Sequence, residues 1–114
     1  MLNAMRLLPE FFPQITGFQW DDGNSEKNWR RHRVSRAEAE QVFLNRPLFL
    51  ADDPRHSVAE PRFFALGRTD DDRLLVAVFT LRGPAVRVIS VRPMSRRERK
   101  FYAQAKSSEE DSTL

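Results

Sequence analysis

The sequence of 114 residues contains no cysteine, which excludes both a disulfide framework and a thiolate metal site. It has only two histidines, His32 and His56, so imidazole proton transfer near neutral pH depends on one of these. It also lacks a long apolar run. Residues 1–14 are apolar only in short pieces, interrupted by Arg6, Glu10 and two prolines, which is too broken for a signal peptide or a membrane span. We therefore expect a soluble, cytoplasmic protein.

Basic residues outnumber acidic residues, and the excess lies before the C-terminal end. The chain has 19 Lys and Arg and 16 Asp and Glu. Three of the acids lie in residues 107–114, which have no base, so residues 1–106 carry 19 basic and 13 acidic residues, a net charge of +6. Sixteen of the basic residues are arginine, whose planar fork binds phosphate or carboxylate through two hydrogen bonds. This excess predicts an anionic partner, either nucleic acid or an acidic protein, although surface ion pairs can engage about half of the arginines.

The length and the apolar content predict one α+β domain. Pro9 and Pro13 forbid a continuous helix near the start, so residues 1–14 are expected to form an irregular extension. We place the domain at 15–105. The acidic residues 106–114 have no core to join and are expected to be disordered.

Three helices are predicted from their start signals. Several polar residues precede EKNWRRHR (26–33), which predicts a first helix. Ser35 and Glu38 have the spacing of a capping box, in which each side chain satisfies a backbone amide, and this box starts a second helix that runs through Phe43. A second capping box at residues 95–98 starts the terminal helix at a run of basic residues.

Alternating apolar residues predict five strands, in which connections rich in Asp, Pro and Gly suit hairpins among the last four. They are ITGFQW (15–20), PLFLA (47–51), RFFALGR (62–68), LLVAVFTL (74–81) and VRVISVR (86–92). The strand LLVAVFTL is apolar on both faces, so we expect it in the middle of a small antiparallel sheet.

Several linked motifs resemble the BrnT family of type II toxins. They are FQWD (18–21), EKNWRRHRVS (26–35), EAEQVF (38–43), DPRHSVAEPRFFALGR (53–68), LLVAVFT (74–80) and VRVISVRPMSRRERKFY (86–102). The resemblance covers about residues 15–103. It implies a RelE-like fold, and an endoribonuclease activity that needs no metal or cofactor and inhibits translation. It also implies neutralisation by a ribbon-helix-helix antitoxin of the BrnA type, through which alone the complex binds operator DNA.

The chain departs from the family at two places. The family usually has Lys-His-Gly at the end of its first helix, where Arg31, His32 and Arg33 stand here. Glycine ends a helix cheaply in the left-handed conformation, so Arg33 has to accept a steric cost or end the helix differently. The aromatic residue that commonly follows the serine of the next helix is Arg36 here. Both changes add positive charge near the expected site.

Metal-free RNA cleavage requires a base for the 2′-hydroxyl, a cation for the phosphate and an acid for the leaving 5′-oxygen. His56 lies in the loop DPRHS, with Glu60 and Arg62 within reach along the chain. It is the candidate for proton transfer, and a histidine that only hydrogen-bonds its loop is the alternative. His32 follows two arginines at a predicted helix end, where a structural contact is the better interpretation.

Arginines on neighbouring predicted strands are candidates for holding the scissile phosphate if they face one groove. An aromatic side chain, Trp20 or Tyr102, offers a stacking surface for a base, although core packing is the stronger interpretation for both. The catalytic candidates are His56, Glu60, Arg62, Arg82 and Arg92, and the RNA-binding candidates are Lys27, Arg73, Arg87, Arg96, Arg97 and Tyr102.

Two other functions remain open from the sequence. A small basic chain is also compatible with a DNA-binding module, but no helix-turn-helix spacing is present. The chain is also compatible with a degenerate toxin that only binds its antitoxin in a repressor complex, and the changes at Arg33 and Arg36 are consistent with this alternative.

Overall fold

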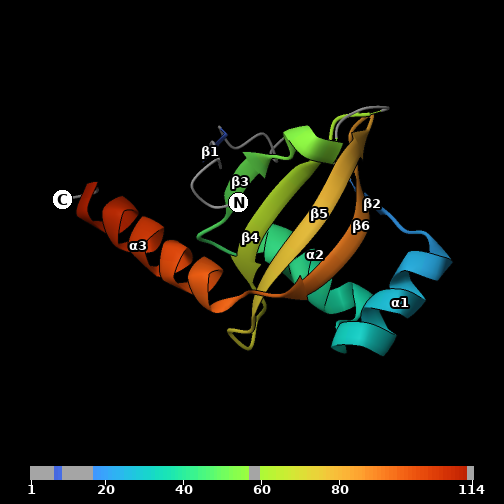
Figure 1. Ribbon diagram of the computed structural model, residues 1–114, viewed down its shortest axis with the longest axis horizontal. Helices are drawn as coiled ribbons and strands as arrows, with labels where there is room; N and C mark the ends of the chain where they lie inside the picture. Colours follow the sequence, from blue (N-terminus) through green and yellow to red (C-terminus); the bar gives the residue numbers. More distant parts are fainter. Residues whose placement is uncertain (1–6, 9–16, 57–59, 113–114) are drawn as a thin grey trace.

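The computed structural model describes residues 7–8, 17–56 and 60–112 and has an α+β fold (Figure 1), which confirms the predicted fold class. The strands are β1 (Leu7–Leu8), β2 (Gly17–Gln19), β3 (Phe49–Asp52), β4 (Phe63–Arg68), β5 (Leu74–Arg82) and β6 (Ala85–Pro93). The helices are α1 (Asp22–His32), α2 (Arg36–Leu44) and α3 (Arg96–Ser112), and a short 3-10 turn, η3, covers Pro54–His56.

One sheet contains all six strands in the order β1-β3-β4-β5-β6-β2. Its pairs are antiparallel except for β2, which runs parallel to β6 at one edge. The strand β5 lies between β4 and β6, as its apolar sequence predicts. A bulge shifts the register of β6, because Val78 pairs with Ser90 while Phe79 pairs with Val88. The extra residue is Ile89, and it re-aims one end of β6 relative to the other.

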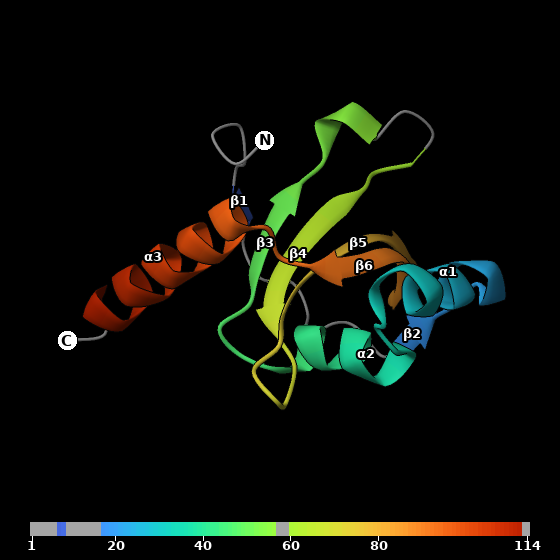
Figure 2. The ribbon, with the colours of Figure 1, turned by 60° about the horizontal axis from the view of Figure 1, so that its bottom comes forward.

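Both faces of the sheet bury apolar side chains, because neighbouring residues on a strand point to opposite faces. The larger cluster joins one face to α2, and includes Val42, Phe43 and Phe79. Phe43 packs edge-on against Phe79 with a ring centroid distance of 5.1 Å. On the other face, Val76 belongs to a second, smaller cluster with Tyr102 of α3. Figure 2 shows α1 and α3 on opposite sides of the sheet.

Both predicted capping boxes form. The Glu38 amide donates to the Ser35 hydroxyl at 3.1 Å, and the Ser35 amide donates to the Glu38 carboxylate at 3.2 Å. In the second box, the Glu98 amide donates to the Ser95 hydroxyl at 3.2 Å and the Ser95 amide donates to Glu98 at 2.8 Å. These bonds satisfy amides that the first turn of a helix leaves unpaired, so both helices begin where the sequence predicts.

The structure shows how α1 ends with Arg33, rather than glycine, as its C-cap. Arg33 adopts the left-handed conformation itself, with φ 53°. Its amide then donates to the carbonyl oxygen of Trp29 at 2.9 Å. Its guanidinium lies 5.3 Å from the centroid of the Trp29 ring, a cation–π arrangement. The helix therefore ends as it does with glycine, and arginine carries the steric cost.

Three predicted boundaries need correction. The first helix begins at Asp22 rather than Glu26, because Asp21 accepts the Asn24 amide at 3.0 Å as the N-cap. The expected irregular extension contains a short strand at Leu7–Leu8, and its other residues lie outside those described. The segment expected to be disordered is helical from 106 to 112, because α3 runs to Ser112.

Candidate functional site

Four predicted site residues gather where β5 turns into β6. We call Glu60, Arg62, Arg82 and Arg87 the hairpin-end cluster. Phe63 pairs with Phe79 in the sheet, so the segment before β4 runs beside the last residues of β5. Arg82 accordingly donates to the Glu60 carboxylate at 3.3 Å, across 22 positions of sequence. Figure 1 shows η3 at the same end of the sheet as the β5–β6 turn.

The side chains of this cluster belong mainly to the sheet face that α1 and α2 leave open. Arg87 pairs with Thr80 in the ladder, and Arg82 follows Thr80 by two residues, so all three share a face. Thr80 is buried, and its hydroxyl donates to the carbonyl oxygen of Pro61 at 2.6 Å, which fixes the segment that carries Arg62. Strand pairing thus holds several arginines at one end of the sheet.

Arg82 and Glu60 form an accessible ion pair, with side chains 44% and 38% exposed. Arg87 lies 4.0 Å from the carboxylate of Asp21, the N-cap of α1. Exposed ion pairs of this length are weak, so an incoming anion can replace the carboxylate at little cost. The cluster therefore offers arginine forks beside an exposed carboxylate.

His56 is the last residue of η3, and its side chain lies outside the described part of the chain, as do residues 57–59. The predicted role of His56 in proton transfer therefore stays a prediction. The backbone of η3 places it in the same connection as Glu60.

Arg92 does not belong to the hairpin-end cluster, which corrects its expected place in one groove with Arg82. Arg92 pairs with Val76 in the ladder, whereas Arg82 pairs with Ala85. Val76 and Arg82 are six residues apart on β5, so the two arginines lie about 20 Å apart along the strand. The two arginines are on neighbouring strands, but they lie at opposite ends of them.

The partner of Arg92 is Glu98, which is only 2% exposed. Two hydrogen bonds join the guanidinium to the carboxylate, at 2.6 and 2.8 Å. The hydrogen bond to Glu98 raises the pKa of Arg92. Burial acts to raise the pKa of Glu98, but hydrogen bonds from Arg92 and Ser95, with the charge of Arg92, together lower it. The pair ties β6 to α3 and is structural.

Two RNA-binding candidates have structural contacts, which corrects the assignment of Tyr102 and leaves that of Arg73 a prediction. Arg73 donates to the carbonyl oxygens of His32 and Arg33, both at 2.7 Å, and to Glu38 at 3.1 Å. It closes the end of α1 against the start of α2. Tyr102 is 4% exposed, and its hydroxyl donates to the carbonyl oxygen of Pro47 at 2.6 Å, so its ring is not available to a base.

Three of the remaining candidates are exposed and lie outside the hairpin-end cluster. Arg96 and Arg97 are at the start of α3, beyond the Arg92 end of the sheet, and Lys27 is on α1. Trp20 is half-buried against the core, and its indole nitrogen donates to Glu40 at 2.8 Å. Trp29 was not among the predicted site residues, although the sequence shows an aromatic residue among four cations on a helix with a narrow apolar face.

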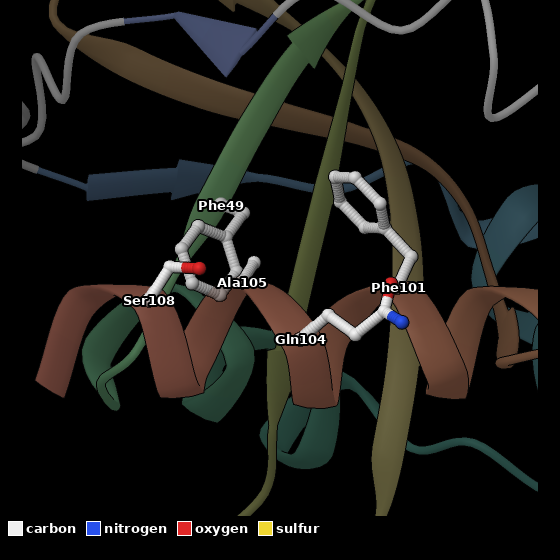
Figure 3. Close-up of a pocket in the computed structure, with 5 residues that line it drawn as sticks. All are labelled: Phe49, Phe101, Gln104, Ala105 and Ser108. Atoms are coloured by element: carbon white, nitrogen blue, oxygen red, sulfur yellow. The ribbon is translucent and has the colours of Figure 1, made fainter. Parts of the chain in front are cut away.

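A shallow cleft of about 340 Å³ lies between α3 and β3 (Figure 3). Phe49 and Phe101 form its walls, with Gln104, Ala105 and Ser108 along the helix. None of these five carries a charge or a titratable group, so the cleft offers no acid–base chemistry. Among the described residues no group of three or more His, Asp or Glu is placed to hold a metal ion. The described helices include none long and apolar enough to cross a membrane.

A family model described as "Ribonuclease toxin, BrnT, of type II toxin-antitoxin system" matches residues 20–98, more than half of the chain. The chain belongs to the BrnT family. The match runs from Trp20 to Glu98 and so includes the hairpin-end cluster. This confirms the resemblance on which the sequence interpretation rests, and it assigns the chain to the ribonuclease toxins of type II toxin–antitoxin systems.

The fold is also similar to a BrnT protein of known structure. The crystal structure of the Brucella abortus ribonuclease toxin BrnT aligns with a TM-score of 0.53 at 20% sequence identity, covering 71% of this chain and 99% of that one. At this identity the likeness shows a shared fold. None of the curated proteins matches the chain. Membership of the BrnT family implies that the chain acts together with an antitoxin.

Proposed function

We propose that this BrnT family member is a metal-independent endoribonuclease that cleaves RNA at the hairpin-end cluster and thereby inhibits translation in the cytoplasm. The observation that carries the proposal is the accessible pair of Arg82 and Glu60 at 3.3 Å, with Arg62 and Arg87 at the same end of the sheet. Arginine forks match phosphate oxygens, and they stabilise the negative charge that builds up on the phosphate during cleavage.

The proposed reaction is an in-line transfer within the RNA. A base removes the 2′-hydroxyl proton, the 2′-oxygen bonds to phosphorus, and the bond from phosphorus to the 5′-oxygen breaks as an acid protonates that oxygen. His56 and Glu60 both lie in the connection between β3 and β4, and they take these two roles. Arg82 and Arg62 hold the phosphate, and Arg87 holds a neighbouring one. No step requires a metal.

The antitoxin is proposed to be a ribbon-helix-helix protein of the BrnA type. A segment with acidic and apolar residues that covers the hairpin-end cluster neutralises its arginines and excludes RNA from it. The complex then binds operator DNA through the antitoxin's own DNA-binding domain. The net charge of +6 over residues 1–106 supports attraction to either polyanionic RNA or an acidic segment.

RNA cleavage in EDTA tests the proposal, with wild type compared with His56→Ala. We expect wild type to cleave and the variant to lose activity by about 10²-fold or more, because a proton-transfer group contributes about this factor. Lys106→Gln, which changes a charge on exposed α3, is the matched control and is expected to cleave like wild type. No cleavage by folded wild type, together with antitoxin binding, would instead support a toxin that acts only in a repressor complex.

A further inference from the structure

We propose that the outer surface of α1 is a second RNA-binding surface, which holds single-stranded RNA outside the cleavage site by stacking a base on Trp29. We define the α1 basic surface as Lys27, Trp29, Arg30, Arg31 and Arg33, all of which are exposed. The ligand class rests on the proposed RNA cleavage, but the surface is made mostly of residues without a role in that reaction.

The exposed tryptophan is the first observation. Trp29 is 50% exposed, whereas Trp20 packs against the core. A large aromatic ring on the surface of a small domain is costly to leave in water, and it is a common platform for an unpaired base. Arg33 lies over the ring at 5.3 Å from its centroid, so the cation and the ring already form a stack that a base can extend.

The charges around this ring are the second observation. Residues 26–33 hold four cations and one anion, Glu26. Lys27 and Arg31 are four residues apart and Lys27 and Arg30 are three apart, so like charges neighbour one another on the helix at a small cost in stability. The C-terminal dipole of α1 offsets part of that cost. In the described part of the chain, none of the four cations forms a salt bridge with a carboxylate, so they remain available to phosphates.

The chemistry of the surface favours RNA over an acidic protein segment. The fully buried centre of a protein interface is depleted in charge and rich in apolar contacts. Here one ring stands among four cations, and the described α1 residues form no apolar groove beside it. Such a surface is much more typical of nucleic-acid binding, where phosphates take the cations and bases take the ring.

The position of α1 connects this surface to the hairpin-end cluster. The N-cap of α1, Asp21, lies 4.0 Å from Arg87, and the Asn28 side chain accepts the backbone amide of Val91 at 3.2 Å. The helix therefore flanks β6 at the edge of the sheet, as Figure 2 shows. From Asp21 to Lys27 the helix rises about 9 Å. An RNA strand whose phosphate is held at Arg87 reaches the α1 basic surface as the RNA continues past β6.

The test is binding of a fluorescein-labelled 2′-O-methyl oligouridine dodecamer, measured by anisotropy in EDTA over a range of salt concentrations. The probe lacks the attacking hydroxyl, so binding is measured whether or not the protein cleaves RNA. We expect Trp29→Ala to raise Kd roughly tenfold, and to lose the part of the tryptophan quenching that RNA causes in wild type. The double change Arg30→Gln with Arg31→Gln is expected to reduce the slope of log K against log salt by about 1.4.

The matched control is Lys100→Gln with Lys106→Gln, which removes the same charge from exposed positions of α3. It is expected to keep the wild-type Kd and slope. An equal loss in this control would show that only net charge matters, and wild-type binding by both α1 variants would remove the site. If the α1 variants bind RNA normally but no longer bind the antitoxin, the α1 basic surface is a protein interface. Absence of cleavage with the α1 effect intact would refute the proposed reaction and leave the second surface standing.

Discussion

At the scale of single residues, Arg33 carries a conformational cost that a glycine would avoid. A residue with a Cβ in the left-handed conformation costs about 1–2 kcal/mol, and Arg33 has φ 53°. Its stacking on Trp29 returns about 0.5–1 kcal/mol at an exposed site. The stacking therefore offsets only part of the conformational cost of arginine at this position, which also adds a cation to the surface of α1.

This balance predicts the order of two variants. Arg33→Ala loses the stacking and keeps the strain, whereas Arg33→Gly loses the stacking and relieves the strain. We expect the glycine variant to be more stable than the alanine variant by about 1 kcal/mol in urea unfolding. Equal stability of the two would mean that the left-handed conformation is not maintained in solution.

Glu98 makes the stability of the fold dependent on pH. Its pKa is lower in the folded protein than the ordinary value of 4.5, so the unfolded chain binds its proton first as the pH falls. The stabilisation is fully present above about pH 4.5, and it is lost as the pH falls through the lower pKa of the folded state. We expect Glu98→Gln to flatten this acid dependence in urea unfolding, measured at a series of pH values.

The exposed glutamate Glu26 provides the control for this measurement. Glu26→Gln keeps the same chemical change but touches no described partner, so it is expected to retain the wild-type acid dependence. If both variants respond to acid as wild type does, the pair of Arg92 and Glu98 is not formed in solution.

At the scale of elements, the contact between α2 and β4 is so close that it requires a glycine. A Cβ on Gly67 would lie 2.9 Å from both the carbonyl oxygen and a side-chain methyl of Val42. We expect Gly67→Ala to destabilise the protein by about 1–3 kcal/mol, because the backbone of α2 has to move away from the sheet. Gly17→Ala in β2 is the matched control, since nothing lies within 4 Å of its added Cβ, and it is expected to be neutral or slightly stabilising.

The second prediction at the scale of elements concerns the tail, residues 107–114. The part of α3 that packs on the sheet is near Phe101 and Tyr102, whereas residues 107–113 are polar. A chain ending at Lys106 is expected to keep its stability within about 0.5 kcal/mol and to retain RNA cleavage and antitoxin binding. Loss of either activity would place the end of α3 in the working protein.

The helices and strands were largely predictable from local sequence patterns, but the residues at which they begin and end were less predictable. Two capping boxes and the alternation of the strands identified α2, α3 and the four strands β3 to β6. The start of α1 was missed because several polar residues competed as caps, and only the structure shows that Asp21 accepts the amide. The two-residue strand β1 exists only through its pairing with β3, which no local pattern of Leu7–Leu8 reveals.

At the scale of the whole molecule, the sheet separates two kinds of arginine. Those at the β5–β6 turn are accessible and weakly paired, and Arg92 at the other end is held by a buried carboxylate. We expect Arg82→Lys to lower RNA cleavage with little change in stability, because the fork is lost and the charge is kept. Arg92→Lys is expected to lower stability and leave the cleavage rate of folded protein unchanged. If Arg92→Lys instead lowers RNA cleavage and Arg82→Lys instead lowers the stability in urea, the cleavage site lies at the α3 end of the sheet.

The candidate site was only partly predictable, because residue type does not reveal a partner. Arg62, Arg82 and Arg87 were expected to share a groove with Arg92, and strand pairing brings the first three to one end of the sheet, beside Glu60. Arg73 and Tyr102 were assigned to RNA on charge and aromaticity alone. Their partners, Glu38 and the carbonyl oxygen of Pro47, are 35 and 55 positions away, so tertiary packing decides these roles.

The parallel pairing of β2 with β6 has a consequence for how the protein is made. Gly17–Gln19 is synthesised early, but its partner Ala85–Arg87 is synthesised late, and α1 is fixed only when Val91 can meet Asn28. Chains emerge from the ribosome with their N-terminal part first. The edge of the sheet that carries Arg87 thus cannot assemble until most of the chain has left the exit tunnel. A ribosome that translates this protein has nearly completed its task before the hairpin-end cluster of the product exists.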